Sequence, residues 1–380
     1  LLTNGSGNAF TSQLLITTND NDTPTDGTYA ANVSVDGGTT NLILGNSTID
    51  GNLTLLSGGT ITDTDGSTVT VKGTLSATTD ASNRIITLDD LVVTGAFTLS
   101  PHGTGAVTIV NAAGLNLAAS TMGGTFSGTA TTGNITQSGA LDIEGATTLV
   151  TLGQGATIDL LTNGSGNAFT SQLLITTNDN NTPTDGTYAA NVSVDGGTTN
   201  LILGNSTIDG NLTLLSGGTI TDTDGSTVTV KGTLTATTDQ LNKIITLNDL
   251  AVDGAFTLAP DGTGAVTIVN AVNLNLAAST MGGTFSGTAT TGDISDSGNL
   301  AITGASTFIT TANNRSIILD QSGNAFTSNV TMQAGDGSAA FNNITFVDSA
   351  DVRLHSSAAS AGDLFINAGT DLDVDGSLNI

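Results

Sequence analysis

The sequence lacks cysteine and tryptophan, and its 380 residues include only two tyrosines and a single glutamate, Glu144. The absence of cysteine excludes disulfide scaffolds, thiol nucleophiles and cysteine-ligated metals. The scarcity of Glu, Lys and Arg argues against a helical protein, because these residues together with Ala and Leu build helices. Apolar runs stay well below the ~18 residues of a membrane-spanning helix, so we expect no membrane insertion.

Positive charge is also scarce, with six basic residues against 33 acidic ones and a net charge of −27. Such a chain is a poor partner for nucleic acid or anionic lipid. The residues present in quantity are Thr, Ser, Asn, Asp, Gly and Val, which favour strands and turns. Apolar residues still make up 37% of the chain, enough to bury a core and to argue against disorder.

Long repeats organise the chain. The segment LLTNGSGNAFTSQLLITTND begins at Leu1 and begins again at Leu160, a period of 160 − 1 = 159 residues. The identity continues in the segment that starts at Asn32 and again at Asn191, and a third, diverging copy begins near Ile317. The predicted organisation is therefore two solenoid repeats, 1–159 and 160–316, followed by a partial repeat, 317–380.

Within each copy, short alternating segments such as NLTLL, STVTV and AVTIV are separated by Gly, Asn, Asp and Ser. This pattern predicts many short strands joined by turns, with essentially no helix. Sandwiches and barrels need bulky rings to fill their cores, whereas a solenoid has a narrow interior that Val, Ile, Leu, Ala and Thr can fill. The sequence therefore predicts an all-β fold, a parallel β-helix or β-solenoid in which one period advances ~38 Å at ~4.8 Å per coil.

Two passages, TTGNITQSGALDIEGATTL and GNLTLLSGGTITDTDGSTVTVKGTL, resemble the strand repeats of filamentous-haemagglutinin-like and autotransporter-type adhesins and of giant repetitive bacterial surface proteins. The likeness covers most of the chain and is one of composition and rhythm. The resemblance implies a right-handed parallel β-helix in an extracellular or cell-surface location. It transfers no functional residue.

The motifs of common enzyme sites are absent: there is no G-x-S-x-G, P-loop, G-x-G-x-x-G or H-E-x-x-H. Of the two histidines, His102 is replaced by Asp261 in the second copy, and His355 has no partner constellation. Polysaccharide-cleaving β-helices need a base near their carboxylates, and bases are almost absent here. We therefore expect a protein that is not an enzyme.

Closely spaced aspartates raise one further possibility, a calcium site, because Ca²⁺ prefers carboxylate oxygens. The candidates lie in three kinds of segment: TDTDG, which occurs twice, the C-terminal run before Gly376, and NDNDTPTDG. They are Asp63, Asp65, Asp222 and Asp224, then Asp371, Asp373 and Asp375, and finally Asp20 and Asp26. The same aspartates are also explained if they stabilise turns by bonding to the neighbouring backbone, or if they line the outer face of an acidic strand. The sequence leaves open a chain without a cofactor and one that binds calcium.

Function follows from the repeats. We expect a structural segment of an extracellular filament, fibre or sheath that elongates by continuous or end-to-end solenoid stacking. The expected partner is the protein itself, end to end, with lateral association and surface glycans as further candidates. The alternative is the stalk of a cell-surface adhesin whose binding tip lies outside this segment.

Overall fold

The computed structural model describes residues 7–18, 31–178, 189–335, 342–359, 362–376 and 378–379. The chain divides into two compact units, Leu1–Gly197 and Thr198–Ile380. These bounds are out of phase with the copies at 1–159, 160–316 and 317–380. A stack of similar turns can be divided at many places, so the organisation into those copies stays a prediction.

The first unit has one continuous parallel sheet along one side. In the described residues its strands follow the order β1 (Val33–Asp36), β4 (Leu53–Ser57), β7 (Leu75–Thr79), β9 (Ala96–Ser100), β11 (Leu115–Leu117), β14 (Ile135–Gln137), β17 (Ile158–Leu160) and β20 (Val192–Asp195).

The opposite side of the first unit is built from the strands that alternate with these along the chain. They are β2 (Leu42–Leu44), β3 (Ser47–Ile49), β5 (Ile61–Asp63), β6 (Val69–Val71), β8 (Ile86–Val93), β10 (Val107–Asn111), β13 (Phe126–Ala130), β16 (Thr147–Gln154) and β19 (Gln172–Asn178). A short third sheet contains β12 (Ser120–Met122), β15 (Leu141–Ile143) and β18 (Ala168–Phe169), and the 3-10 turn η2 (Gly164–Gly166) precedes β18.

The second unit repeats this plan. One side holds β23 (Leu212–Ser216), β26 (Leu234–Thr238), β28 (Ala255–Ala259), β30 (Leu274–Leu276), β33 (Ile294–Asp296), β36 (Ile317–Leu319), β39 (Ile344–Asp348) and β41 (Leu364–Ala368). The other holds β21 (Leu201–Leu203), β22 (Ser206–Ile208), β24 (Ile220–Asp222), β25 (Val228–Val230), β27 (Ile245–Val252), β29 (Val266–Asn270), β32 (Phe285–Ala289), β35 (Ser306–Thr310), β38 (Val330–Ala334), β40 (Val352–Ala359), β42 (Leu372–Val374) and β43 (Leu378–Asn379). The third sheet contains β31 (Ser279–Met281), β34 (Leu300–Ile302) and β37 (Ala325–Phe326).

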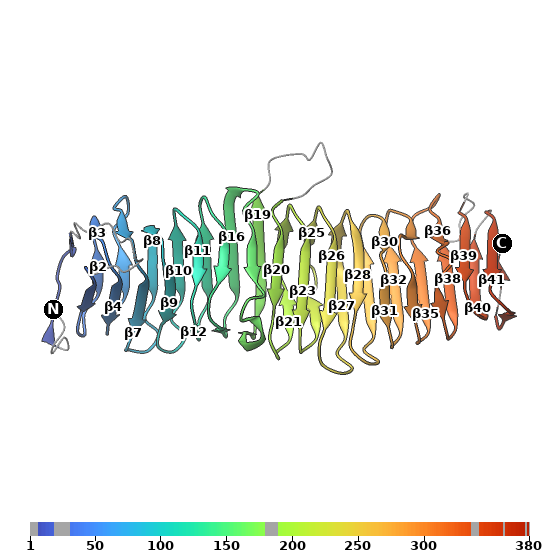
Figure 1. The fold of residues 1–380 in the computed structure, drawn as a ribbon, viewed down its shortest axis with the longest axis horizontal. Helices are drawn as coiled ribbons and strands as arrows, with labels where there is room; N and C mark the ends of the chain where they lie inside the picture. The colour runs from blue at the N-terminus through green and yellow to red at the C-terminus, as the bar shows by residue number, and fades with distance from the viewer. Residues whose placement is uncertain are drawn as a thin grey trace. The chain divides into compact units, whose positions relative to one another are not determined.

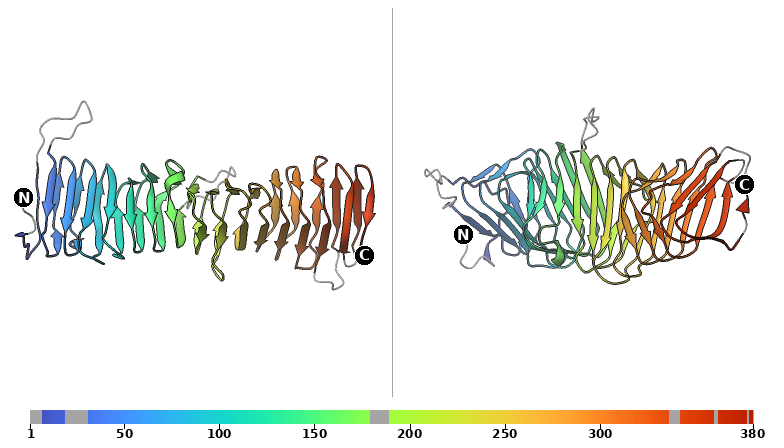
Figure 2. Two further views of the ribbon diagram at one scale, coloured as in Figure 1. Left: turned by 90° about the horizontal axis from the view of Figure 1, so that it is seen from below. Right: turned by 45° about the vertical axis from the view of Figure 1, so that its right-hand side comes forward.

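Each strand pairs in parallel with the strand one turn away, as in the pair of β10 and β13, where Val107 lies opposite Phe126. Within each unit the strands lie side by side as successive rungs (Figure 1) and keep this arrangement in other views (Figure 2). The described residues make about 15 turns and contain no α-helix. The predicted all-β parallel solenoid is confirmed. No helix in the described residues is long and apolar enough to span a membrane.

Alternation along each strand turns one set of side chains inward. In β4, for example, Leu53 and Leu55 are buried and Thr54 is exposed. The interior also holds more aromatic rings than the sequence predicted, since eight of the eleven phenylalanines are fully buried. Rings from successive turns of the second unit stack in series, with centroids 5.3 Å apart for Phe285 and Phe308 and 4.9 Å apart for Phe326 and Phe346. Rings that stack on one another one turn apart fit even a narrow interior, so a solenoid can bury phenylalanine. This stacking depends on contacts between turns, which the sequence alone does not show.

Corner residues fasten each turn to the next. The side-chain oxygen of Asn52 accepts a hydrogen bond from the backbone N–H of Thr74, 22 residues later, at 2.8 Å, and Asn211 accepts one from Thr233 in the same way. Inside the first unit, Asn111 is fully buried and bonds both the N–H and the C=O of Val93. The interior is thus held by polar side chains as well as by apolar packing.

Candidate functional site

A gap in the strand that pairs with β8, between β5 and β6, forms the most distinctive polar site. The first half of β8 pairs with β5, with Thr87 opposite Thr62, and its second half pairs with β6, with Leu91 opposite Val69. A turn closed by the hydrogen bond from Ser67 N–H to the carbonyl of Thr64 separates β5 from β6. Asp89 and Asp90, which lie between the two paired halves of β8, therefore face a turn.

No described strand lies opposite Asp89 and Asp90 at this gap, and the carboxylate of Asp63 accepts the backbone N–H groups that a strand would otherwise bind. Its Oδ1 accepts a hydrogen bond from the backbone N–H of Asp89 at 3.2 Å, and its Oδ2 accepts one from Asp90 at 2.9 Å. In return, Oδ2 of Asp90 accepts a hydrogen bond at 2.8 Å from the N–H of Gly66, whose φ of 72° suits the tight turn. The two adjacent turns of the solenoid are locked by these three bonds.

Burial shapes the electrostatics of this site. Asp63 is only 9% exposed, and the loss of water around its carboxylate raises its pKa to about 6. The two backbone N–H groups act in the opposite direction, while the nearby carboxylate of Asp89 raises the pKa further. Asp63 therefore takes up a proton at a higher pH than an exposed aspartate does.

The second unit contains the same arrangement with one change. Oδ2 of Asp222 accepts hydrogen bonds from the N–H groups of Asn248 and Asp249, each at 2.8 Å, and Asp249 accepts one from Gly225 at 3.0 Å. Burial again raises the pKa of Asp222. Asn248 stands where the first unit has Asp89, so a neutral amide replaces a second carboxylate.

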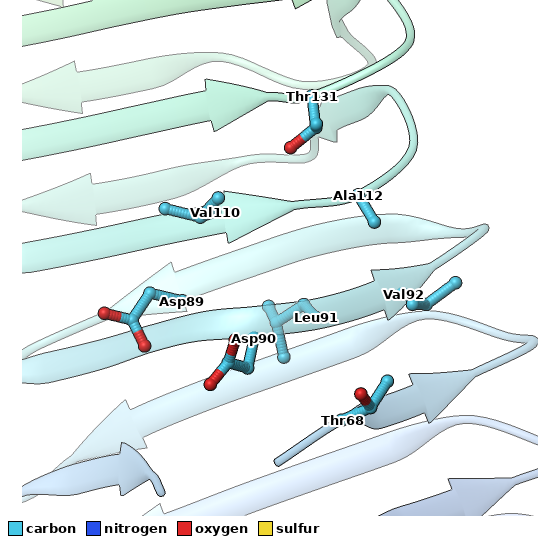
Figure 3. Close-up of a pocket in the computed structure, with 8 residues that line it drawn as sticks. All are labelled: Thr68, Asp89, Asp90, Leu91, Val92, Val110, Ala112 and Thr131. Carbon is cyan, nitrogen blue, oxygen red and sulfur yellow. The ribbon is translucent and has the colours of Figure 1, made fainter. Parts of the chain in front are cut away.

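A shallow groove opens beside the gap on the outer face of the sheet (Figure 3). Its volume is about 230 Å³, and it is lined by Thr68, Asp89, Asp90, Leu91, Val92, Val110, Ala112 and Thr131. The equivalent groove of the second unit has about 210 Å³. In the described part of the chain, no three His, Asp or Glu side chains gather as a metal site would. The groove offers hydroxyl, carboxylate and methyl groups.

The structure separates the aspartates that the sequence singled out for calcium. Asp63 and Asp222 accept backbone N–H groups at the two gaps in strand pairing described above. Asp65 and Asp224, in contrast, are exposed in the adjacent turns. Asp373 is exposed on β42, Asp371 and Asp375 are exposed on either side of it, and Asp20 and Asp26 lie outside the described residues. The oxygens of Asp63 already accept two N–H groups, which use lone pairs that a cation would need. Calcium binding by these residues stays a prediction.

Further buried polar side chains end other three-residue strands. At the end of β33, Asp296 accepts a hydrogen bond from the amide of Asn324 at 2.6 Å, and burial raises the pKa of Asp296. At the end of β14, the amide of Gln137 donates to the side-chain oxygen of Asn167 at 2.6 Å. These residues were not predicted from the sequence, although the alternation in ITD, ITQ and ISD places each third residue on the inner side.

Four successive segments of the chain, residues 30–100, 104–176, 189–259 and 263–333, match one family, described as repeats of unknown function (DUF5649). The chain belongs to this family. Asp63, Gln137, Asp222 and Asp296 lie at the same distance from the start of their respective DUF5649 repeats. The strand-end polar residue is thus a shared feature of the four repeats.

The DUF5649 repeat is about 70 residues long, shorter than the 159-residue copies found by sequence identity. Alternate DUF5649 repeats start 189 − 30 = 159 and 263 − 104 = 159 residues apart, although their bounds do not coincide with the predicted copies 1–159 and 160–316. The gap in strand pairing beside the groove lies in the first and third of the four repeats. No curated protein and no solved structure matches the chain.

Proposed function

We propose that this protein is a structural repeat segment of an extracellular filament, fibre or sheath, and that it does not catalyse a reaction. The observation that carries the proposal is the fastening of one turn to the next. Parallel strands pair in register, and side-chain oxygens of Asn and Asp at the corners accept N–H groups one turn away, as between Asn52 and Thr74. A stack built in this way resists bending, because every turn is bonded to its neighbours by backbone and side chains.

The repeat family supports this proposal. Tandem DUF5649 repeats in a β-solenoid fit an adhesin-like repeat protein. Within that class, we propose a protein of the filamentous-haemagglutinin-like or autotransporter-like type, with the 159-residue copy as its building block. We also propose that the solenoid winds in the right-handed sense, because connections between parallel strands are almost always right-handed. Growth would occur by continuous or end-to-end stacking, outside the cell.

Electron microscopy of the purified, salt-exchanged protein, with and without a chelator, tests the proposal. We expect continuous filaments with an axial repeat near ~38 Å, or a simple multiple of it. Filaments that survive the chelator would show that calcium does not hold them together. Discrete short rods would contradict filament formation and favour the stalk of an adhesin.

A further inference from the structure

The turn between β24 and β25 in the second unit gathers buried oxygens that lack hydrogen bonds. Four side-chain oxygens are shielded from solvent and have no hydrogen-bond partner among the described residues: Oδ1 of Asp222, Oγ1 of Thr223, Oγ of Ser226 and Oδ1 of Asn248. Buried polar atoms are nearly always hydrogen-bonded. Several unsatisfied oxygens around one turn therefore indicate that another atom binds between them.

The fold brings these four residues to one place. Asp222 ends β24, and the turn that follows is closed by the hydrogen bond from Ser226 N–H to the carbonyl of Thr223 at 2.9 Å. Ser226 is only 7% exposed, so its hydroxyl lies on the inner side of the turn. The backbone N–H of Asn248 binds Oδ2 of Asp222 at 2.8 Å, which brings Asn248 to the same carboxylate from the next turn of the solenoid.

The equivalent site of the first unit differs in how its carboxylate is used. There, the two N–H groups of β8 bind the two different oxygens of Asp63. In the second unit both N–H groups of β27 bind Oδ2 of Asp222, and Oδ1 is left without a partner among the described residues. Ser67 is as buried as Ser226 and its hydroxyl is equally unsatisfied in the described structure. Of the two sites, the second alone combines such a hydroxyl with an unused carboxylate oxygen.

The charge of this site favours a cation over a neutral molecule. A buried carboxylate is usually paired with a positive group or bound to a metal ion. Two further carboxylates lie on the same two segments: Asp224 is exposed in the turn, and Asp249 accepts the N–H of Gly225 at 3.0 Å. They make the local potential more negative, which attracts cations. Carboxylate and amide oxygens, completed by water, are ligands that Ca²⁺ prefers.

We propose that the second unit binds one calcium ion through Oδ1 of Asp222, Oδ1 of Asn248 and the hydroxyls of Thr223 and Ser226. Asp224 is not a ligand, and the first copy of TDTDG does not bind the ion, so the site differs from the one that the aspartate spacing predicts. With a single carboxylate the binding is weak, and the dissociation constant is on the order of 1 mM. The ion would tie one turn of the solenoid to the next, whether or not the protein forms filaments.

Thermal melting of the whole chain at pH 7.5, with calcium chloride compared against magnesium chloride at equal concentration, tests the proposal. We expect about 10 mM calcium to raise the melting temperature by about 2 to 4 °C more than magnesium does. Ser226→Ala removes one ligand and should lose most of this difference. Its calcium-free melting temperature should not change, because the hydroxyl has no partner among the described residues to lose. Ser67→Ala is the matched control in the first unit and should keep the full difference.

A second variant tests the site in the opposite direction. Asn248→Asp adds a carboxylate and should bind calcium more tightly than the wild type, although repulsion from Asp222 destabilises the calcium-free protein. Equilibrium dialysis against calcium in about 0.5 M NaCl, which screens diffuse binding to the acidic surface, should give one ion per chain for the wild type and fewer for Ser226→Ala.

Three results would overturn the proposal. The first is an equal rise in melting temperature with calcium and with magnesium, and the second is an equal calcium response of Ser226→Ala and Ser67→Ala. The third is a melting temperature that does not depend on calcium. A water molecule between the four oxygens, or an Asn248 amide turned so that its Nδ2 donates to Asp222, would give this last result.

Discussion

The carboxylate of Asp63 accepts the backbone N–H of Asp90 at 2.9 Å, across one turn of the solenoid and at the point where a neighbouring strand is interrupted. A buried carboxylate usually costs free energy, because it loses water. Here the two N–H groups that it binds would otherwise lack a strand partner. The carboxylate thus loses water but satisfies two backbone N–H groups. Because protonation changes the cost of burying it, the contribution of this site to the stability of the fold depends on pH.

The first prediction concerns that pH dependence. Burial raises the pKa of Asp63 from 3.8 to about 6, so the folded state binds the proton more tightly than the unfolded state. The resulting stabilisation is fully present below pH 3.8 and is lost as the pH rises through 6. We expect Asp63→Asn to remove this dependence, so that the difference in melting temperature between pH 5 and pH 7.5 becomes smaller than in the wild type.

The exposed neighbour Asp65 supplies the control, since Asp65→Asn removes one carboxylate without changing the buried site. The comparison between variants matters because other acidic residues of this chain also titrate. An equal pH response in Asp63→Asn and Asp65→Asn would contradict a special role for the buried carboxylate.

The second prediction uses the natural difference between the two units. Asp89 lies beside Asp63, whereas Asn248 holds the same place beside Asp222. An amide can donate a hydrogen bond to a carboxylate, but a second carboxylate repels it unless one of the two is protonated. We expect Asp89→Asn to raise the melting temperature at pH 7.5 and Asn248→Asp to lower it, with a smaller change at pH 5 in both variants.

Asp142→Asn is the matched control for Asp89→Asn, because it removes the same charge from an exposed position on β15. A gain in stability of the same size in Asp142→Asn would assign the effect to net charge. Proton nuclear magnetic resonance or equivalent titration of Asp63 in Asp89→Asn should show a lower pKa than in the wild type.

The third prediction concerns a close approach in the interior. A Cβ atom added to Gly128 would lie 2.8 Å from Cζ of Phe126 and 2.9 Å from a methyl group of Leu115, and Gly287 has an equivalent contact with Phe285. We expect Gly128→Ala and Gly287→Ala each to destabilise the fold by about 1 to 3 kcal/mol, because the buried ring must move. Chemical denaturation measures the change. Ser127→Ala, on the outer side of the same strand, should have little effect, and an equal loss in that variant would point to strand propensity.

The sequence predicted those features that depend on alternation alone. The alternation in NLTLL predicted a strand, and in the structure its Leu53 and Leu55 share the buried side, while the repeats and turn residues led to a parallel solenoid. It did not reveal which polar residues turn inward, because TDTDG is equally good as a solvated turn. Asp63 is buried while Asp65 is exposed only because β5 ends with its third residue on the inner side. Contacts between turns depend on the pairing register, and a single sequence does not specify that register.

The buried asparagines give the last prediction. Asn111 accepts a hydrogen bond from Val93 N–H at 2.8 Å and donates to the carbonyls of Val93 and Gly114, and Asn270 makes the same set of bonds in the second unit. Replacing either with alanine leaves these buried backbone groups without partners, at about 1 to 3 kcal/mol for each. We expect Asn111→Ala and Asn270→Ala to lower the free energy of unfolding strongly.

Asn41→Ala is the control for these variants. Asn41 is exposed and makes the common corner bond to Thr60 N–H at 3.0 Å, so its removal should cost at most about 1 kcal/mol, since water can replace it. Urea denaturation of the three variants gives the comparison. Similar losses at Asn41 and Asn111 would mean that the bonds between turns contribute equally wherever they lie. A much larger loss at Asn111 would place the strongest link between turns inside the solenoid, where water cannot compete for it.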